Sequence, residues 1–161
     1  MDKPTHLIEF ETMLLGRHLS LHNPQRHGGH LDRSAYTLLS RISMEGPMSI
    51  GQLSDAFGLD ASTLNRQTNA MTRDGLVERI PDPEGGMARK FRITAEGENR
   101  LEMERAGNVS ALERMLTDWD ADDVATFAGW LQRFNTDIER LSGRPWPRPE
   151  SAGIRRHPAE G

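Results

Sequence analysis

The clearest hydrophobic period in the chain lies near its C-terminal end, in the run WDADDVATFAGWLQRFNTDIERL. Asp120 and Asp123 favour a helix start here, because carboxylates are stabilised at the positive end of a helix dipole. A second stripe with helical spacing covers residues 5–21. The pattern therefore predicts a long helix near each end of the chain. In the C-terminal helix the apolar face consists of Val124, Phe127, Ala128, Leu131, Phe134, Ile138 and Leu141.

Three further helix starts share one pattern, a polar capping residue flanked by two apolar residues. The caps are Asp32, Ser49 and Asp60, and Gln52 completes a capping box with Ser49. Gly58 ends the helix that Ser49 begins, and two short helices joined by a tight turn containing glycine predict a helix-turn-helix. The apolar pairs that flank the caps are Leu31 with Tyr36, Met48 with Leu53, and Leu59 with Leu64.

Two short β-prone runs follow, LVERI and KFRIT, and the breaker-rich stretch PDPEGGMA between them predicts a hairpin loop. In the second run Phe91 and Ile93 alternate with Lys90 and Arg92, so one face of the strand is apolar and the other is cationic. A helix-turn-helix followed directly by a basic hairpin predicts a winged helix. Thr94 then caps another helix, which we expect to run to about residue 116.

The last stretch of the chain, SGRPWPRPESAGIRRHPAEG, is rich in proline and glycine and has no hydrophobic period. Such a segment cannot bury enough apolar surface to offset the entropy lost when a chain becomes ordered. We therefore predict a disordered tail over residues 143–161.

The charge distribution suggests what the protein binds. The formal net charge of the 161 residues is −4. Residues 62–92 nevertheless hold six Lys or Arg against four carboxylates, whereas residues 101–142 hold nine carboxylates against four Arg. This uneven charge fits a protein that offers one face to a polyanion, although ordinary variation in surface charge produces the same counts.

The sequence disfavours several classes of site and location. The absence of cysteine excludes disulfides, thiol redox sensing and cysteine-ligated zinc. No run approaches the roughly 18 apolar residues needed to cross a bilayer, and the N-terminus MDKPTHLIEFE lacks a secretory hydrophobic region. We therefore expect a cytoplasmic protein with no membrane partner. No nucleophile–base constellation, phosphate loop or catalytic carboxylate pair is evident, so we expect no enzymatic activity and no cofactor.

Three motifs then occur in order: SIGQLSDAFGLDASTLNRQTNAMTRDGLVER, DPE and RITAEGE. On these motifs, residues 31 to about 141 resemble the MarR family of dimeric winged-helix transcription regulators. The resemblance implies a mainly α fold with a small β-hairpin wing, in which a winged helix-turn-helix is joined to a helical dimerisation region. It also implies that the first helix and the last two form the interface of a homodimer.

On this basis the chain divides into four parts. Residues 1–30 would be an N-terminal dimerisation helix and loop, and residues 31–94 a winged helix-turn-helix DNA-binding domain. Residues 95–142 would supply the C-terminal dimerisation helices, and residues 143–161 the disordered tail. Each winged helix of the dimer would read one half of a palindromic site in double-stranded DNA.

The chain departs from the family pattern at two places. Gly86 and Met87 stand in the wing where the family often has a pair of arginines, which leaves Arg89 or Lys90 as the nearest cation. In the recognition helix, the pair Gln67–Thr68 stands where the family usually buries apolar residues. The first departure weakens the expected contact of the wing with the minor groove.

The polar face of the recognition helix matches the chemistry of base reading. Arg66 can form a bidentate pair with guanine, and Asn65 can do so with adenine. Ser62 and Thr63 are short enough to let the helix enter the major groove and can hydrogen-bond phosphates. Solvated polar residues and ordinary surface ion pairs are the alternative. We predict these DNA contacts, with Arg73, Arg89 and Lys90 on phosphates: Ser62, Thr63, Asn65, Arg66, Asn69, Arg73, Arg89 and Lys90.

Five of the six histidines lie within the first 30 residues: His6, His18, His22, His27 and His30. His18 and His22 stand four residues apart, a spacing that can bind a metal, and His27 and His30 in the following loop could add ligands. The chain offers no cysteine and no clear carboxylate ligand nearby. We therefore favour solvated or interface histidines and predict no metal site.

A small-molecule site is implied only by the resemblance. Many MarR-family proteins bind a small, often aromatic and anionic ligand between the dimerisation helices and the winged helix. By their positions in the chain, His18, Tyr36 and Arg41 could line such a space. Tyr36 has an alternative role as the apolar partner of Leu31.

These expectations combine into one functional hypothesis. The chain would be a sequence-specific transcription regulator, a ligand-responsive repressor that binds a pseudo-palindromic operator as a homodimer. Two alternatives remain: a winged-helix module for protein interactions that does not bind DNA, and a metal-responsive regulator of the same fold.

Overall fold

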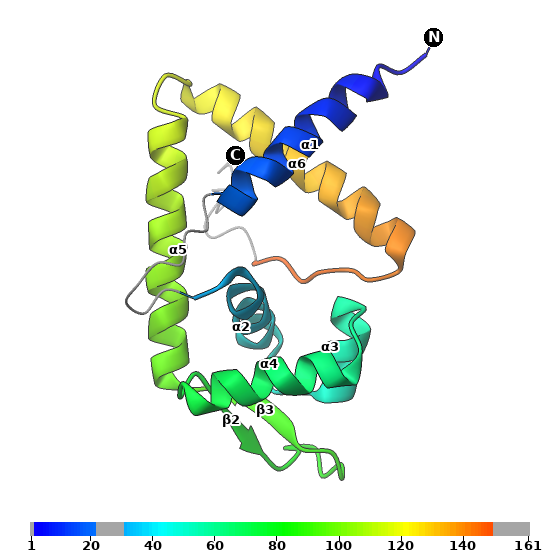
Figure 1. Ribbon diagram of the computed structural model, residues 1–161, viewed down its shortest axis with the longest axis vertical. Helices are drawn as coiled ribbons and strands as arrows, with labels where there is room; N and C mark the ends of the chain where they lie inside the picture. Colours follow the sequence, from blue (N-terminus) through cyan, green and yellow to red (C-terminus); the bar gives the residue numbers. More distant parts are fainter. Residues whose placement is uncertain (1, 22–30, 150–161) are drawn as a thin grey trace, which may run out of the picture.

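The computed structural model describes residues 2–21 and 31–149. The chain forms six helices and three short strands in these residues (Figure 1). The predicted class is confirmed: a mainly helical chain with a winged helix-turn-helix. In chain order the elements are α1 (Thr5–Leu21), α2 (Arg33–Glu45), β1 (Met48–Ser49), α3 (Ile50–Phe57), α4 (Ala61–Arg73), β2 (Val77–Ile80), β3 (Lys90–Ile93), α5 (Ala95–Met115) and α6 (Ala121–Ser142).

The sheet has one strand more than the predicted hairpin. Its order is β1-β3-β2, with both pairs antiparallel, and Met48 of β1 faces Phe91 of β3. From sequence, Met48 and Ser49 predicted only a helix start, with Ser49 as the cap and Met48 as its flanking apolar residue. A two-residue strand carries no period of its own, so it exists because β3 offers a free edge beside it.

Most of the predicted helix caps are present. The Asp32 carboxylate accepts a hydrogen bond from the Ala35 amide at 2.8 Å. Ser49 and Gln52 form the full capping box, with donor–acceptor distances of 3.1 and 2.9 Å. Asp60 does occupy the N-cap position of α4, but its side chain makes no capping hydrogen bond. The start of α4 therefore depends on the turn at Gly58, whose φ of 64° is readily reached by glycine.

The hydrophobic core lies in the winged helix and extends into the first turns of α5. Leu53, Leu64 and Phe91 are at most 1% exposed, and Leu101 of α5 packs with them. Thr68 is also fully buried, and its hydroxyl donates to the Leu64 carbonyl at 2.8 Å. A threonine thus replaces an apolar residue here because it satisfies its hydroxyl within its own helix.

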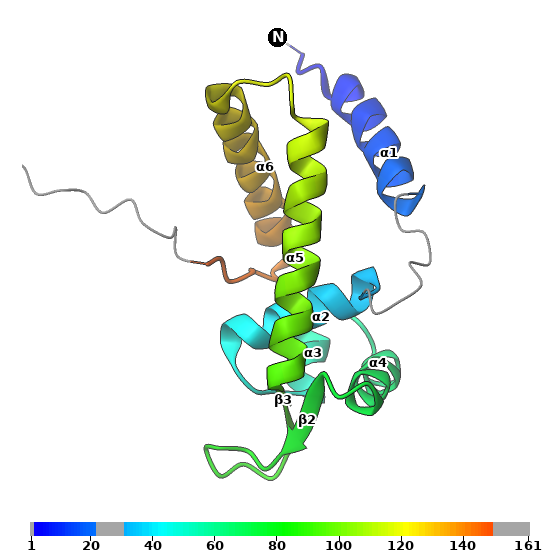
Figure 2. The same cartoon turned by 90° about the vertical axis from the view of Figure 1, so that its left-hand side faces the viewer.

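Helices α1 and α6 lie away from this core, at the far end of α5 from the wing (Figures 1 and 2). No residue of α6 is buried. Its apolar stripe is open to solvent in the single chain, as is most of the apolar side of α1. The exposed residues include Leu7, Phe10, Phe127, Leu131, Phe134, Ile138 and Leu141.

The segment after α6 differs from the predicted disordered tail. Residues 143–149 leave α6 and contact the winged helix, where the rings of Trp146 and Phe57 lie edge to face. The sequence pattern missed this order because it depends on one aromatic side chain and distant partners rather than on a period. Residues 150–161, the remainder of the predicted tail, lie outside the described residues.

Two glycines of α5 provide a matched test of how this helix joins the winged helix. A Cβ at Gly97 would lie 2.7 Å from Cγ1 of Ile93 and closer still to the carbonyl oxygen of Leu76. At Gly107 nothing lies within 4 Å.

We therefore expect Gly97→Ala to lower the free energy of unfolding by about 1–3 kcal/mol through overpacking. Gly107→Ala should instead raise it by up to about 1 kcal/mol, because alanine is the better helix former. Denaturant unfolding of both variants measures the difference. Equal effects at the two positions would contradict a tight joint at Gly97.

Candidate DNA-binding surface

Helix α4 is amphipathic in a way that leaves one polar face open. Leu64, Thr68 and Met71 are buried against the core at helical spacing. The opposite side exposes Ser62, Asn65, Arg66 and Asn69, while Thr63 is half-buried. The helix contains no carboxylate between Ala61 and Arg73. The buried stripe thus fixes which side chains α4 presents to a partner.

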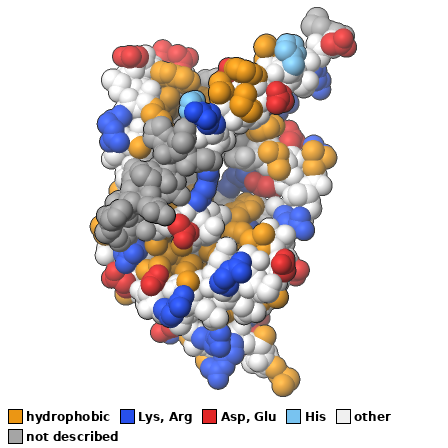
Figure 3. All heavy atoms as spheres, in the orientation of Figure 1, with side chains coloured by type: hydrophobic (Ala, Val, Ile, Leu, Met, Phe, Trp, Pro, Cys, Tyr) orange, Lys and Arg blue, Asp and Glu red, His pale blue; other side chains and the backbone are white. Residues whose placement is uncertain are grey.

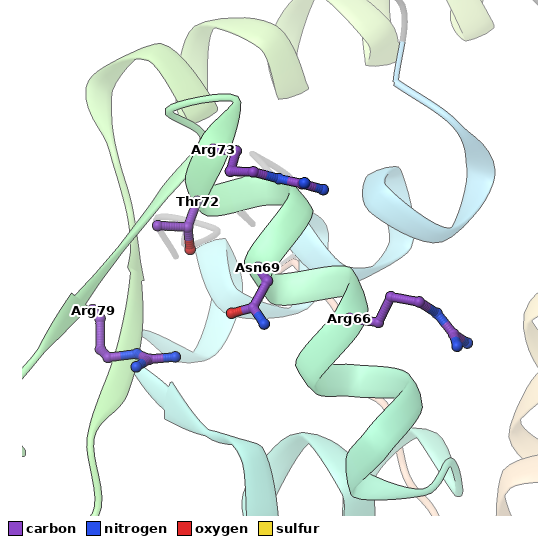
Figure 4. Close-up of a pocket in the computed structure, with 5 residues that line it drawn as sticks. All are labelled: Arg66, Asn69, Thr72, Arg73 and Arg79. Atoms are coloured by element: carbon purple, nitrogen blue, oxygen red, sulfur yellow. The ribbon is translucent and has the colours of Figure 1, made fainter.

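Part of this face borders an open pocket of about 760 Å³ between α4 and the sheet (Figure 4). The side chains that line it are Arg66, Asn69, Thr72, Arg73 and Arg79. Three of the predicted DNA-contacting residues are therefore brought to one surface. In Figure 4, Arg79 extends from β2 toward Asn69 of α4.

Arg79 was not among the residues predicted from sequence. It faces Phe91 across the β2–β3 pair, and its guanidinium carbon lies 5.3 Å from the centre of that ring. It also lines a second pocket, of about 340 Å³, together with Arg89 of the wing and the start of α3. Arg79 thus connects the α4 surface to the wing. The signal that could have identified Arg79 is the register of the two strands, because cross-strand partners share a face of the sheet.

The two remaining predicted cations of the wing region differ in their surroundings. Arg89 is exposed, whereas the Lys90 side chain is only 13% exposed and its Nζ lies 3.5 Å from the Asp82 carboxylate. Within the described residues, neither Arg66, Arg73 nor Arg89 forms a salt bridge. These three arginines are available to an anionic partner, as is Arg79, whereas Lys90 must leave Asp82 before it can meet a phosphate.

Asp82 also organises the wing loop. Its carboxylate accepts a hydrogen bond from the Glu84 amide at 2.9 Å. This bond and the charge of Lys90 hold the pKa of Asp82 below its ordinary value of 3.8. Because its pKa is lowered, the ionised Asp82 carboxylate stabilises the folded loop above pH 3.8. This stabilisation is lost only as the pH falls through the lowered pKa. The wing loop therefore keeps this contact at neutral pH.

The wing tip is apolar rather than cationic. Met87 is fully exposed there, at a position where the sequence departs from the family pattern. Arg92, farther along β3, pairs with Glu78 across the strands, and its Nε lies 2.8 Å from the carboxylate oxygen. The positive charge is thus concentrated at the base of the wing and on α4.

The three residues predicted to line a ligand site lie on two helices, His18 on α1 and both Tyr36 and Arg41 on α2. His18 is an exposed residue of α1, and Tyr36 packs partly against the core from α2. The Arg41 side chain is only 8% exposed and pairs with Glu45 at 2.8 Å. Neither pocket described above includes any of the three. Their role in ligand binding stays a prediction.

The described part of the chain holds no group of three or more His, Cys, Asp or Glu residues arranged to bind a metal. The histidines at 22, 27 and 30 that could complete the suggested metal site lie outside the described residues. Among the helices that the structure describes, none is long and apolar enough to span a bilayer.

Comparisons with known proteins agree with this geometry. A family model described as the MarR family matches residues 31–86. YxaD of Bacillus subtilis (strain 168), described as an uncharacterized HTH-type transcriptional regulator, is 35% identical over 135 residues, which cover 83% of this chain and 94% of that protein.

Solved structures share the fold at lower identity. FabT of Streptococcus pneumoniae, in complex with DNA, aligns with a TM-score of 0.68 and 14% identity over 86% of this chain and 99% of that one. PcaV of Streptomyces coelicolor, in complex with its natural ligand, aligns with a TM-score of 0.59 and 23% identity over 84% of this chain and 95% of that one.

The family assignment rests on these findings together. The relative matches over most of both chains, and the family model covers the chain from α2 through β2, including α4 with its exposed polar face. The chain therefore belongs to the MarR family of winged-helix transcription regulators.

Proposed function

We propose that this regulator is a ligand-responsive repressor that binds a pseudo-palindromic operator as a homodimer, with one α4 in each half-site. The observation that carries the proposal is the exposed face of α4, which offers polar side chains and arginines without any carboxylate. Carboxylates would repel the DNA backbone, and short polar side chains let a helix enter the major groove. Because its target is duplex DNA, we expect the protein to act in the cytoplasm.

Base reading is assigned to the first turns of α4. Arg66 can donate two hydrogen bonds to guanine, and Asn65 can form the bidentate pair with adenine. Both side chains are exposed. Ser62 and Thr63, nearer the helix start, are assigned to phosphates, which position the helix but carry no sequence information.

The remaining arginines are assigned to the DNA backbone. Arg73 and Arg79 border the pocket beside α4, and Arg89 borders the next pocket toward the wing. Asn69, which lies between the two sets, can contact either a base edge or a phosphate. The likeness of the fold to FabT, which was solved in complex with DNA, supports DNA binding by this fold.

The homodimer is supported by the exposed apolar side chains of α1 and α6. Figure 3 shows hydrophobic side chains at the end of the molecule that carries these helices, and Lys and Arg side chains at the wing end as well as elsewhere on this face. Burying one large apolar side chain contributes about 1.5–3 kcal/mol, so a partner that covers this stripe would be strongly bound. A second copy of the chain offers a matching stripe, and a twofold dimer suits a palindromic site.

The proposed response to a ligand follows from the comparison with PcaV. PcaV shares the fold and was solved with its natural ligand. For this chain a small aromatic or anionic effector is our proposal, with His18, Tyr36 and Arg41 as the candidate residues. Such a ligand would release DNA by changing the spacing of the two recognition helices.

Selection of bound duplexes from a random DNA library tests the proposed function directly. We expect the wild-type protein to enrich a palindrome whose half-sites lie roughly 10 to 10.5 base pairs apart, because each half-site must meet one recognition helix. Binding should also weaken steeply as salt rises. If folded, dimeric protein enriches no sequence, the alternative of a module for protein interactions is favoured.

The arginines on the two sides of the pocket should differ in what they recognise. Arg66→Ala should cost about 1–3 kcal/mol of binding and relax base preference at one position of each half-site. Arg79→Ala should weaken binding to all sequences alike and reduce the salt slope by about 1.

Binding titrations of both variants on matched and single-base-altered operators, at several salt concentrations, separate these effects. A uniform loss for Arg66→Ala would reassign that residue to a phosphate.

The dimer interface has a matched pair of probes on α6. Leu131→Asp places a carboxylate in the apolar stripe and should dissociate the dimer. Thr136→Asp adds the same charge at an exposed position whose hydroxyl bonds only within the helix, to the Gln132 carbonyl, and should leave the dimer intact. Sedimentation of the two variants and the wild type gives the masses. An unchanged dimer for Leu131→Asp would place the interface elsewhere.

A further inference from the structure

Residues 144–148, which we call the strap, cross from the end of α6 to the winged helix. Gly143 caps the end of α6, and its φ of 69° turns the chain. The Arg144 amide donates to the Glu139 carbonyl at 3.1 Å. The strap reads RPWPR, with a further proline at position 149. Each proline fixes its own φ, so the segment is stiff without any secondary structure.

On the winged-helix side the strap is held by its tryptophan. The Trp146 and Phe57 rings meet edge to face, with centroids 5.3 Å apart and planes at 83°. The Arg41 guanidinium lies 4.7 Å from the Trp146 ring centre and donates to the Pro145 carbonyl at 3.5 Å. Trp146 therefore packs between the end of α3 and the middle of α2.

On the α6 side the strap is held by Glu139. Arg148 donates two hydrogen bonds to this carboxylate, at 2.6 and 3.0 Å, and the Trp146 amide donates a third at 3.2 Å. Paired N–H donors of this kind favour the ionised carboxylate and lower the pKa of Glu139. One acidic side chain of α6 thus fixes both the middle and the end of the strap.

The strap also touches the turn of the helix-turn-helix. A Cβ built on Gly58 would lie 2.8 Å from the guanidinium carbon of Arg144. Gly58 ends α3, and α4 begins three residues later, at Ala61. The strap therefore contacts the winged helix at the element that orients the recognition helix.

Apart from the strap, the covalent link between the winged helix and α6 in the described residues runs through α5. No residue of α6 is buried, and Figure 1 shows α5 and α6 diverging from their shared corner. A single helical connection can bend or twist. A second attachment, between the far end of α6 and the winged helix, restricts that motion. The strap provides that second attachment.

We propose that the strap fixes the orientation of the winged helix relative to α6, with Trp146 as its positioning residue. In the dimer, this orientation sets the distance between the two recognition helices. The proposal rests on the proposed function only for its effect on DNA, because the orientation itself belongs to a single chain.

A distance measurement tests the strap without DNA. The chain has no cysteine, so Asn65→Cys on α4 and Thr136→Cys on α6 introduce two unique sites for spin labels, both exposed. The labelled full-length chain is mixed with excess unlabelled wild type, so that each dimer carries at most one labelled copy. We expect one narrow distance distribution.

Adding Trp146→Ala should broaden or shift that distribution, whereas Trp146→Phe, which keeps a ring against Phe57, should leave it close to wild type. A distribution unchanged by Trp146→Ala, in protein that is folded by circular dichroism, would overturn the proposal. So would equal broadening by the alanine and phenylalanine variants, since the ring contact would then not be the cause.

The effect on DNA is measured with the cysteine-free chain. The wild-type operator is compared with the same operator carrying one extra base pair between its half-sites. Trp146→Ala should reduce the preference for the original spacing about fivefold or more, while Trp146→Phe retains it. Affinity for random DNA should stay the same, because α4 and the wing are unaltered.

These two measurements separate failure of the strap from failure of the proposed function. A broadened distance distribution in a protein that selects no operator would support the strap and reject the DNA-binding proposal. Intact spacing preference in the alanine variant, alongside a lowered melting temperature, would show that Trp146 only stabilises the fold and would overturn the strap.

Discussion

The long helix α5 packs closely on the carbonyl of Leu76 because Gly97 has no side chain there, and the shape of the molecule depends on this close approach. Around this contact, the Thr94 amide donates to Leu76 at 3.0 Å and its hydroxyl donates to Gly75 at 2.6 Å. Leu101, one turn farther along α5, is buried in the winged-helix core. The direction in which α5 leaves the core is therefore fixed within its first two turns.

The charge distribution also differs between the winged helix and the two long helices α5 and α6. The basic side chains proposed to contact DNA lie on α4 and the base of the wing, whereas α5 and α6 together carry nine carboxylates against five arginines. The acidic helices would be repelled by a DNA backbone and the basic surface attracted to it. A protein with net charge −4 can thus approach DNA in one preferred orientation. Net charge by itself would have argued against a DNA-binding protein.

The sequence predicts the features that depend on neighbouring residues and fails where distant residues decide. The capping box of Ser49 and the buried stripe of α4 follow from local spacing, and the structure has both. By contrast, β1 forms only because it pairs with β3, and Trp146 contacts Phe57 and Arg41, which both lie more than 80 residues earlier in the chain. The candidate surface shows the same limit. The residues on α4 could be named from helical spacing, whereas the position of Arg79 between α4 and the wing depends on the strand register.

The turn at Gly58 has a consequence for how this family varies. Its positive φ alone would also accept asparagine, which tolerates left-handed backbone better than other residues with a side chain. The adjacent Arg144 guanidinium adds a second restriction, because any Cβ at this position would displace it. In homologues, the two positions should therefore covary: glycine in the turn where an arginine follows the last helix, and a freer choice where it does not. The residue at this turn would then indicate whether the segment after the last helix packs against it.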